Sequence, residues 1–194
     1  MSSRNEIRRR MRRRRRALSR TEREHAAGAV AAVLGGLSVF RAARRTAVFV
    51  ASDGEIDLGR AMRQYACKSY YLPVVPPRGR RRMLFARVRP ETSFKKNRYG
   101  ILEPDAPIAS LATARELDLV LAPLVAFDRR GGRLGMGGGY YDATFEFLAS
   151  RTCWVEPKLV GVAFSFQEVP HVERESWDIP LTAIVTELGV ISAT

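Results

Sequence analysis

Cysteine and histidine are both scarce in this sequence, with two of each in 194 residues. Cys67 and Cys153 lie far apart and form no C-x-x-C motif, so neither a disulfide framework nor a structural metal site is predicted. His25 and His171 form no recognisable pair with them, which argues against a zinc centre or a Cys–His nucleophile. Two reduced cysteines are typical of a cytoplasmic protein.

Long apolar runs are also missing. The longest uncharged stretch near the start covers residues 25–40 and is mostly Ala, Gly and Val, which is shorter than the ~20 apolar residues of a membrane-spanning helix. A secretory signal is not predicted, because residues 21–24, three of which are charged, interrupt the passage to this stretch and no small-residue cleavage site follows. We therefore expect a cytoplasmic protein without a membrane partner.

Acidic residues are outnumbered, since 20 Asp and Glu face 33 Lys and Arg for a formal net charge of +13. Such an excess predicts an anionic partner. Residues 1–16 alone hold nine arginines and one glutamate, a net +8. They lack interleaved aromatic residues, and no helix-turn-helix or RNP pattern follows, so nucleic acid is only the alternative. Arg4 and Arg8 are spaced to share one helix face and to reach a single polyphosphate.

The composition, 46% hydrophobic and 9% aromatic, is that of a folded chain with one core, so a single domain over residues 1–194 is expected. Two helices are predicted first, over residues 3–18 and 19–37, the second opened by a capping box of Ser19 and Glu22. Further helices are predicted over residues 58–67 and 140–150. Strands are predicted over residues 46–51, 70–75, 83–88, 117–127, 159–164 and 183–191, the last able to fold back around Leu188 and Gly189. This alternation predicts an α/β sheet covered on both faces.

A glycine-rich loop is the strongest local signal, with six glycines within nine residues between a predicted buried strand and a predicted helix. Glycines let backbone N–H groups approach an anion, and a helix N-terminus adds positive potential. The loop lacks the Gly-Lys-Ser/Thr ending of a P-loop, and no acid suited to a ribose follows it. It predicts a phosphate site of another architecture, the alternative being a flexible surface turn.

Three acidic residues are candidates for binding. Asp142 directly follows the glycine loop and Asp178 lies in "SWDIPL", so a fold that joins them offers two oxygen ligands for Mg²⁺. The alternative for each is capping or turn chemistry. Glu55 follows a predicted buried strand, where it can accept hydrogen bonds from a heterocycle. Its neighbours Asp53 and Asp57 are interpreted as solvated loop acids.

Five segments carry a resemblance to a known family: "SDGEID", "NRYGILEP", "LDLVLAPLVAFD", "RRGGRLGMGGGYYD" and "ESWDIPLTAIVTE", in this order. With them the chain resembles 5-formyltetrahydrofolate cyclo-ligases over nearly its whole length. The resemblance implies a three-layer α/β/α fold with a mostly parallel central sheet and two N-terminal helices. It also implies cyclisation of 5-formyltetrahydrofolate to 5,10-methenyltetrahydrofolate with ATP and Mg²⁺, through a phosphorylated formyl group and without an enzyme nucleophile.

The resemblance also implies roles for individual residues. Asp142 and Asp178 match the magnesium positions. The folate positions are Val50, Glu55, Tyr99 and Tyr140. The ATP positions are Arg4, Arg8, Arg133, Leu134, Gly135, Met136, Gly137, Gly138, Gly139, Tyr140 and Tyr141.

Two features depart from the family pattern. Some members carry basic residues where this chain has Met136 and Gly138, so phosphate neutralisation is expected from Arg133 and the N-terminal arginines. The arginine run after Arg8 is denser than the family requires, which leaves room for a nucleic-acid partner. The partners expected are ATP and 5-formyltetrahydrofolate, with or without a polyglutamate tail, for a monomeric enzyme. A sugar-phosphate isomerase of similar architecture is a further alternative, against which the glycine loop argues.

Overall fold

Two helices open the chain, and each begins with a capping box. The computed structural model describes residues 3–151, 156–175 and 177–192. Helices α1 (Arg4–Ala17) and α2 (Arg20–Gly36) are separated by two extended residues, Leu18 and Ser19, and the short helix α3 (Ser38–Ala42) follows. The capping box predicted from Ser19 and Glu22 is confirmed: the Ser19 backbone N–H donates to Glu22 Oε2 at 2.7 Å.

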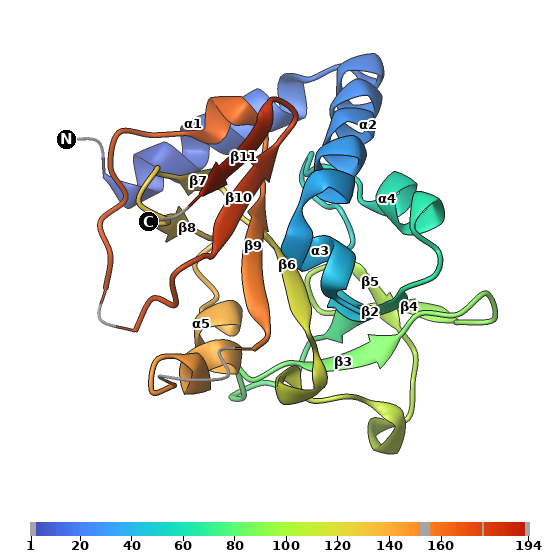
Figure 1. Cartoon of the computed structure of the whole chain (residues 1–194). Coiled ribbons are helices and arrows are strands. Elements are labelled where there is room, and N and C mark those ends of the chain that lie inside the picture. The colour runs from blue at the N-terminus through green and yellow to red at the C-terminus, as the bar shows by residue number, and fades with distance from the viewer. Residues whose placement is uncertain (1–2, 152–155, 176, 193–194) are drawn as a thin grey trace.

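A seven-stranded sheet forms the centre of the molecule (Figure 1), in the order β11-β10-β9-β6-β1-β2-β3. The five inner strands run parallel, while β3 and β11 pair antiparallel at the two edges. The predicted mostly parallel sheet is thus confirmed. The strands are β1 (Arg45–Ala47), β2 (Ser69–Val74), β3 (Leu84–Arg87), β6 (Leu119–Pro123), β9 (Lys158–Val162), β10 (Ala183–Thr186) and β11 (Gly189–Ser192).

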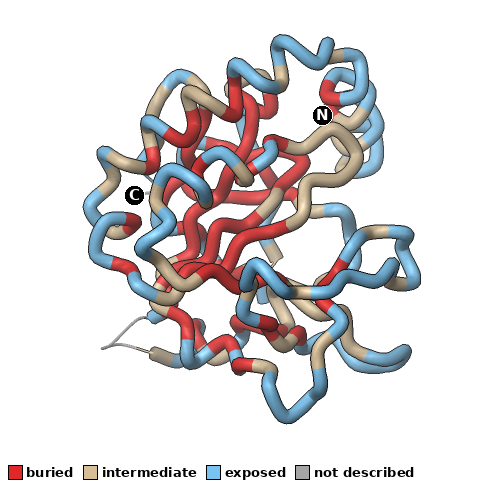
Figure 2. Tube along the Cα trace, turned by 90° about the vertical axis from the view of Figure 1, so that its right-hand side faces the viewer, coloured by how far each residue is buried: buried red, intermediate tan, exposed pale blue. Residues whose placement is uncertain are grey.

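Helical layers cover both faces of this sheet, which confirms the three-layer α/β/α arrangement. Leu119 and Leu121 pack with α2, α3 and α4 (Gly59–Gln64) on one face. Val120 packs on the opposite face with Phe145 of α5 (Tyr140–Phe145). This alternation follows from the two-residue period of a strand. Figure 2 shows the result, a buried sheet between more exposed outer segments. Four 3₁₀ helices complete the helical segments: η1 (Ile108–Ser110), η2 (Ala114–Glu116), η3 (Glu146–Leu148) and η4 (Ser165–Gln167).

The prediction of one continuous strand over residues 117–127 is wrong. Strand β6 ends at Pro123, and a separate strand β7 (Ala126–Phe127) pairs with β8 (Arg133–Leu134). The chain leaves the sheet because the Leu124 and Val125 carbonyls accept hydrogen bonds from the Gln167 side chain, each at 2.8 Å. A second small hairpin, β4 (Phe94–Lys96) with β5 (Leu102–Pro104), lies in a stretch for which no strand was predicted.

Other boundaries are shorter than predicted. The strand predicted over 46–51 ends at Ala47, because the chain turns away toward a left-handed residue at Asp53. The helix predicted over 58–67 covers only α4, and the one predicted over 140–150 changes into η3 after Phe145. The hairpin predicted around Leu188 and Gly189 is confirmed by the antiparallel pairing of β10 with β11.

The strand order reverses direction between β1 and β6. The connection from β1 leads through α4 to β2 on one side, whereas β6 pairs with β1 on the other. Ligands of open α/β sheets bind outside the carboxyl ends of strands at such a switch point. Helix α1 lies there, with Met11 buried against Val125, Ala126 and Leu134. The segments around α1 are therefore where a site is expected.

Candidate functional site

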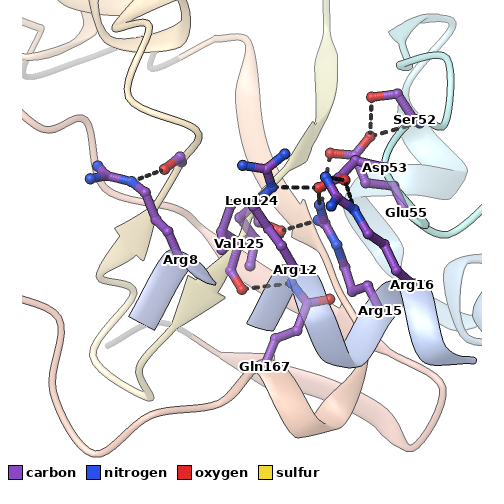
Figure 3. A network of polar contacts seen from close by, with 11 residues as sticks. Arg8, Arg12, Arg15, Arg16, Ser52, Asp53, Glu55, Leu124, Val125 and Gln167 are labelled. Atoms are coloured by element: carbon purple, nitrogen blue, oxygen red, sulfur yellow. Dashed lines mark hydrogen bonds and ion pairs between the residues drawn. The ribbon is translucent and has the colours of Figure 1, made fainter. Parts of the chain in front are cut away.

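Three arginines of α1 converge on one carboxylate in the loop after β1 (Figure 3). Asp53 Oδ2 accepts hydrogen bonds from Arg12 Nε at 2.7 Å and Arg15 Nη2 at 2.8 Å, and its other oxygen is bound by Arg16. Burial alone raises the pKa of Asp53, but the hydrogen bonds from Arg12, Arg16 and Arg15 outweigh it and lower the pKa to about 2. The interpretation of Asp53 as a solvated loop acid was wrong, since its side chain is only 13% exposed.

Arg15 connects this cluster to the sheet. It is completely buried, and its Nη1 donates to the Leu124 carbonyl at 3.3 Å, just past the end of β6. The same Nη1 lies 3.6 Å from Glu55 Oε1. Gly54 has a positive φ of 75°, and a Cβ there would lie 2.9 Å from the Arg15 carbonyl oxygen. Through Arg15, helix α1 therefore contacts both the segment after β1 and the segment after β6.

Glu55 is a largely covered acid, with a side chain that is 11% exposed. Its Oε2 accepts hydrogen bonds from the Ser52 backbone N–H at 3.0 Å and from the Ser52 hydroxyl at 3.3 Å. Burial raises its pKa, against the hydrogen bonds from Ser52 and the nearby Arg15. Val50, two residues before Ser52, is half-buried beside the core on the α2 side of the sheet. A carboxylate held in this way can accept hydrogen bonds from the N–H groups of a heterocycle.

The glycine loop leads from β8 to the start of α5. Gly137 and Gly139 have positive φ values of 97° and 65°, which only glycine adopts without strain, and Gly139 caps α5. Arg8 Nε donates to the Gly135 carbonyl at 2.9 Å, and the Arg8 guanidinium lies 3.7 Å from where a Cβ of Gly137 would be. Arg8 of the first helix therefore lies against this loop. Gly138 and the exposed Met136 supply no positive charge there.

Arg133 joins the two candidate magnesium positions. Its buried guanidinium forms an ion pair with Asp142 and donates to the carbonyl of Ile179, the residue after Asp178. Asp178 Oδ2 accepts a hydrogen bond from the Glu175 N–H at 2.9 Å. The segments that carry Asp142 and Asp178 therefore contact the same side chain. The positive charge of Arg133 is therefore paired with the carboxylate of Asp142.

Arg4 approaches the same acidic segment from α1. Its Nη1 lies 3.1 Å from Glu175 Oε1, and its Nη2 lies 3.9 Å from Asp178 Oδ2. Within the described ranges, no cluster of three or more His, Cys, Asp or Glu side chains has the geometry of a metal centre. A site that uses two carboxylates still fits Mg²⁺, which takes its other ligands from water and phosphate oxygens.

Two adjacent tyrosines at the start of α5 have different surroundings. The Tyr140 hydroxyl lies 2.6 Å from the Tyr99 hydroxyl and accepts a hydrogen bond from Arg98 Nη2 at 2.6 Å. Tyr141 is directed toward the interior, where burial raises its pKa and the charge of Glu55 adds to the rise. Tyr140 is thus brought together with Tyr99, whereas the Tyr141 ring stacks on Phe145 with the ring centroids 6.1 Å apart. Leu134 is buried in the small cluster beneath α1.

Sequence reasoning missed the contacts that several arginines make around the candidate site. Arg12, Arg15 and Arg16 are spaced three and four residues apart, the spacing that places side chains on one helix face. That spacing is the signal that could have indicated a common acceptor, but nothing in the sequence singled out Asp53 as that acceptor. No sequence signal marked Arg98 as the partner of Tyr140.

No helix among the described ranges is both long enough and apolar enough to cross a membrane. Fold and geometry together define an α/β protein with a candidate ligand site at the strand switch point, between an arginine-bearing helix and a glycine loop that caps another helix. Comparison with known proteins makes this more specific. The family model of 5-formyltetrahydrofolate cyclo-ligases matches residues 1–187, and the chain belongs to that family of ligases.

Individual relatives agree with this assignment. The 5-formyltetrahydrofolate cyclo-ligase of Haemophilus influenzae is 37% identical over 147 residues, covering 75% of this chain and 76% of the relative. The protein of the same name from Escherichia coli is 40% identical over 148 residues, covering 74% and 78%. The solved structure of Aquifex aeolicus 5,10-methenyltetrahydrofolate synthetase has a TM-score of 0.81 and 31% identity, covering 98% of this chain and 92% of that one.

Proposed function

We propose that this chain converts 5-formyltetrahydrofolate to 5,10-methenyltetrahydrofolate, consuming ATP in the presence of Mg²⁺ and releasing ADP and phosphate. Family membership supports the overall conversion. The observation that carries the rest is the position of the glycine loop, with Arg8 on one side and the Arg133–Asp142 pair on the other. Backbone amides, a guanidinium and a carboxylate are the groups that a phosphoryl transfer needs for positioning and charge stabilisation.

The proposed reaction needs no nucleophile from the protein. The formyl oxygen attacks the γ-phosphorus of ATP, which breaks the bond to ADP and leaves a phosphorylated iminium group. The nitrogen at folate position 10 then attacks the formyl carbon and loses its proton, and phosphate leaves as the ring closes. In this scheme Glu55 and Val50 hold the pterin, and Tyr99 and Tyr140 border the folate. Residues 133–141, Arg4 and Arg8 hold the nucleotide.

Asp142 and Asp178 are the proposed magnesium ligands. In the described structure each has one oxygen engaged, by Arg133 and by the Glu175 N–H respectively, and none of the described residues hydrogen-bonds to the other. Two such carboxylates suit Mg²⁺ together with phosphate oxygens. The ion supplies charge neutralisation of the phosphates when it is bound. Arg133 then orients Asp142 by holding its first oxygen.

The test is the near-ultraviolet absorbance of the purified protein with 5-formyltetrahydrofolate and MgATP, with ATP and Mg²⁺ each omitted in turn. A rise that requires both is expected. Asp142→Ala should abolish turnover while circular dichroism stays unchanged, and Arg8→Ala should mainly raise the KM for ATP. Asp105→Asn, at an exposed ion pair with Lys95, serves as the control. No rise from folded wild-type protein would refute the proposal, and full activity of Asp142→Ala would remove that residue from the metal site.

We further propose that the chain acts as a single-domain monomer in the cytoplasm. Cys67 is a free, exposed thiol, and Cys153 lies outside the described residues. Nucleic-acid binding is not part of the proposal, because Arg12, Arg15 and Arg16 are engaged by Asp53 within the protein.

A further inference from the structure

Arg15 is a completely buried arginine whose guanidinium lies between two carboxylates of the loop after β1 (Figure 3). Its Nη2 donates to Asp53 Oδ2 at 2.8 Å, and its Nη1 donates to the Leu124 carbonyl at 3.3 Å. Its Nε is buried and has no hydrogen-bond partner among the described residues. A buried charge is costly to desolvate, and a buried ion pair is weak evidence for stability. We therefore asked what else this charge does for its neighbours.

The two oxygens of the Glu55 carboxylate differ in what they contact. Oε2 accepts hydrogen bonds from the Ser52 backbone N–H and hydroxyl. Oε1 accepts no hydrogen bond from any residue that the structure describes, but it lies 3.6 Å from Arg15 Nη1. That distance suits an ion pair and is too long for a hydrogen bond. Arg15 thus places a positive charge beside Oε1 and leaves its lone pairs available to a ligand.

Other charged groups also surround Glu55. Burial raises the pKa of Glu55, hydrogen bonds from Ser52 and the charge of Arg15 oppose that rise, and the charge of Asp53 adds to it. Burial, with the charge of Glu55, raises the pKa of Tyr141 in α5, so that group is uncharged. Within the described ranges, Arg15 supplies the one cation at ion-pair distance from Glu55. On its outer side Glu55 lines a cavity of about 610 Å³, whose other charged residues from α2, α4 and the intervening loop are Arg20, Arg23, Glu24, Asp57, Arg60 and Arg63.

Resting on the function proposed above, in which Glu55 binds the pterin, we propose that Arg15 is a positioning residue for the folate heterocycle. It keeps the Glu55 carboxylate ionised and leaves Oε1 free to accept a hydrogen bond from the heterocycle, while Arg15 itself touches no substrate atom. Hydrogen bonds to an ionised acceptor are roughly twice as strong as those between neutral groups. The loop that carries Glu55 packs directly on α1 at Gly54, where a Cβ would lie 2.9 Å from the Arg15 carbonyl oxygen, and this contact holds the two side chains at a fixed separation.

The test is calorimetric titration of 5-formyltetrahydrofolate, without ATP, into the wild type, Arg15→Gln and Arg15→Lys at pH 6 and at pH 8.5. Without the charge of Arg15 the pKa of Glu55 rises further. Arg15→Gln should therefore bind the folate about tenfold more weakly at pH 6, which corresponds to about 1.4 kcal/mol, and the loss should shrink at pH 8.5, where Glu55 ionises again. Arg15→Lys keeps the charge and should lose less than about threefold at either pH.

Two further variants connect this effect to Glu55. Glu55→Gln cannot ionise, so its weakened binding should be the same at both pH values. The matched control is Arg16→Gln, because Arg16 also binds Asp53, makes no described contact with Glu55 and has a side chain that is 59% exposed. Its affinity should stay within about twofold of the wild type. In steady-state kinetics, Arg15→Gln should raise the KM for the folate and leave the KM for ATP unchanged.

Asp53→Asn tests the same reasoning if Arg15→Gln does not fold, because its expected effect on the pH dependence has the opposite sign. It removes the negative charge beside Glu55 and leaves Arg15 to Glu55 alone, so folate affinity should differ less between pH 6 and pH 8.5 than in the wild type. A larger difference in Asp53→Asn would overturn the proposal. An equal loss at both pH values in Arg15→Gln, or a loss in Arg15→Lys as large as in Arg15→Gln, would do the same and leave Arg15 a structural role.

The same titrations separate this proposal from the proposed reaction. Folate binding with the expected pH dependence in a protein without turnover supports the role of Arg15 and refutes the reaction alone. Turnover combined with a loss in Arg15→Gln that does not depend on pH rejects the role of Arg15 alone. No folate binding by the folded wild type overturns both.

Discussion

Replacing Asp53 with alanine should destabilise the protein far more than the loss of an ordinary surface acid. Asp53 is bound by three guanidinium groups, but their contributions differ. The side chains of Arg12 and Arg16 are 36% and 59% exposed, and exposed pairs contribute roughly 0–1 kcal/mol. The Arg15 side chain is 1% exposed, so Asp53→Ala leaves a buried charge without its closest partner. Removing one member of a buried pair costs about 3–5 kcal/mol.

The remaining contacts of Arg15 set the lower end of that range, about 3 kcal/mol, because the Leu124 carbonyl and Glu55 stay in place. The pKa gives an independent value. A fall from 3.8 to about 2 corresponds to about 2.4 kcal/mol at 1.36 kcal/mol per unit. Because the folded-state pKa lies below the unfolded value, this stabilisation is fully present above about pH 4 and is lost as the pH falls toward 2. The two routes agree on about 2–3 kcal/mol.

Urea unfolding of the wild type and of Asp53→Ala at pH 7 and at steps down to pH 2 measures both quantities. The variant should be less stable by about 2–3 kcal/mol at pH 7, and the difference should shrink below pH 4. Asp105→Asn is the matched control, because its ion pair with Lys95 is more than half exposed on both sides. A cost for Asp53→Ala no larger than that of the control, or a difference independent of pH, would refute the reasoning.

Three further changes test the surroundings of this cluster and the core by urea unfolding. Gly54→Ala combines a positive φ with a clash against the Arg15 carbonyl and should cost about 2 kcal/mol, whereas Gly36→Ala, with nothing within 4 Å, should cost nothing. Gly161→Ala places a Cβ 2.6 and 2.8 Å from two leucine side chains and should cost about 1–3 kcal/mol. Relative to the wild type, Glu55→Gln should gain more free energy of unfolding at pH 7 than at pH 4.5. The raised pKa of the acid means that its contribution falls as pH rises through that pKa, and equal stability changes at both pH values would contradict this.

The sheet could be predicted because each inner strand is an apolar run between helical segments, and that pattern is local. The break after β6 could not be predicted in the same way. Leu124 and Val125 are as apolar as the strand before them, yet they leave the sheet for the Gln167 side chain, more than 40 residues further along the chain. A contact that is distant in sequence decides where this strand ends.

The candidate site likewise combines features that neighbouring residues predict with features that depend on residues distant in the sequence. The glycine loop and Asp142 are adjacent in sequence, so their proximity was predictable from the residues themselves. Asp53 resembled a solvated acid in an Asp-Gly turn because nothing near it in sequence is basic. Its three partners come from α1, about 40 residues earlier, and only the docking of that helix converts the turn into a buried ion-pair cluster.

The arginine run that first suggested a nucleic-acid partner has a different explanation in the fold. Arg8 holds the glycine loop at Gly135, and Arg12, one helical turn further on, holds Asp53 in the loop after β1. A rigid helix that binds both loops fixes the distance between the two walls of the proposed site, the one that holds phosphates and the one that holds a heterocycle. Two walls on mobile loops would each need ordering when substrate binds, at a cost in affinity. Five of the nine arginines of α1, which are Arg4, Arg8, Arg12, Arg15 and Arg16, are therefore accounted for by carbonyl and carboxylate oxygens of the segments around the helix.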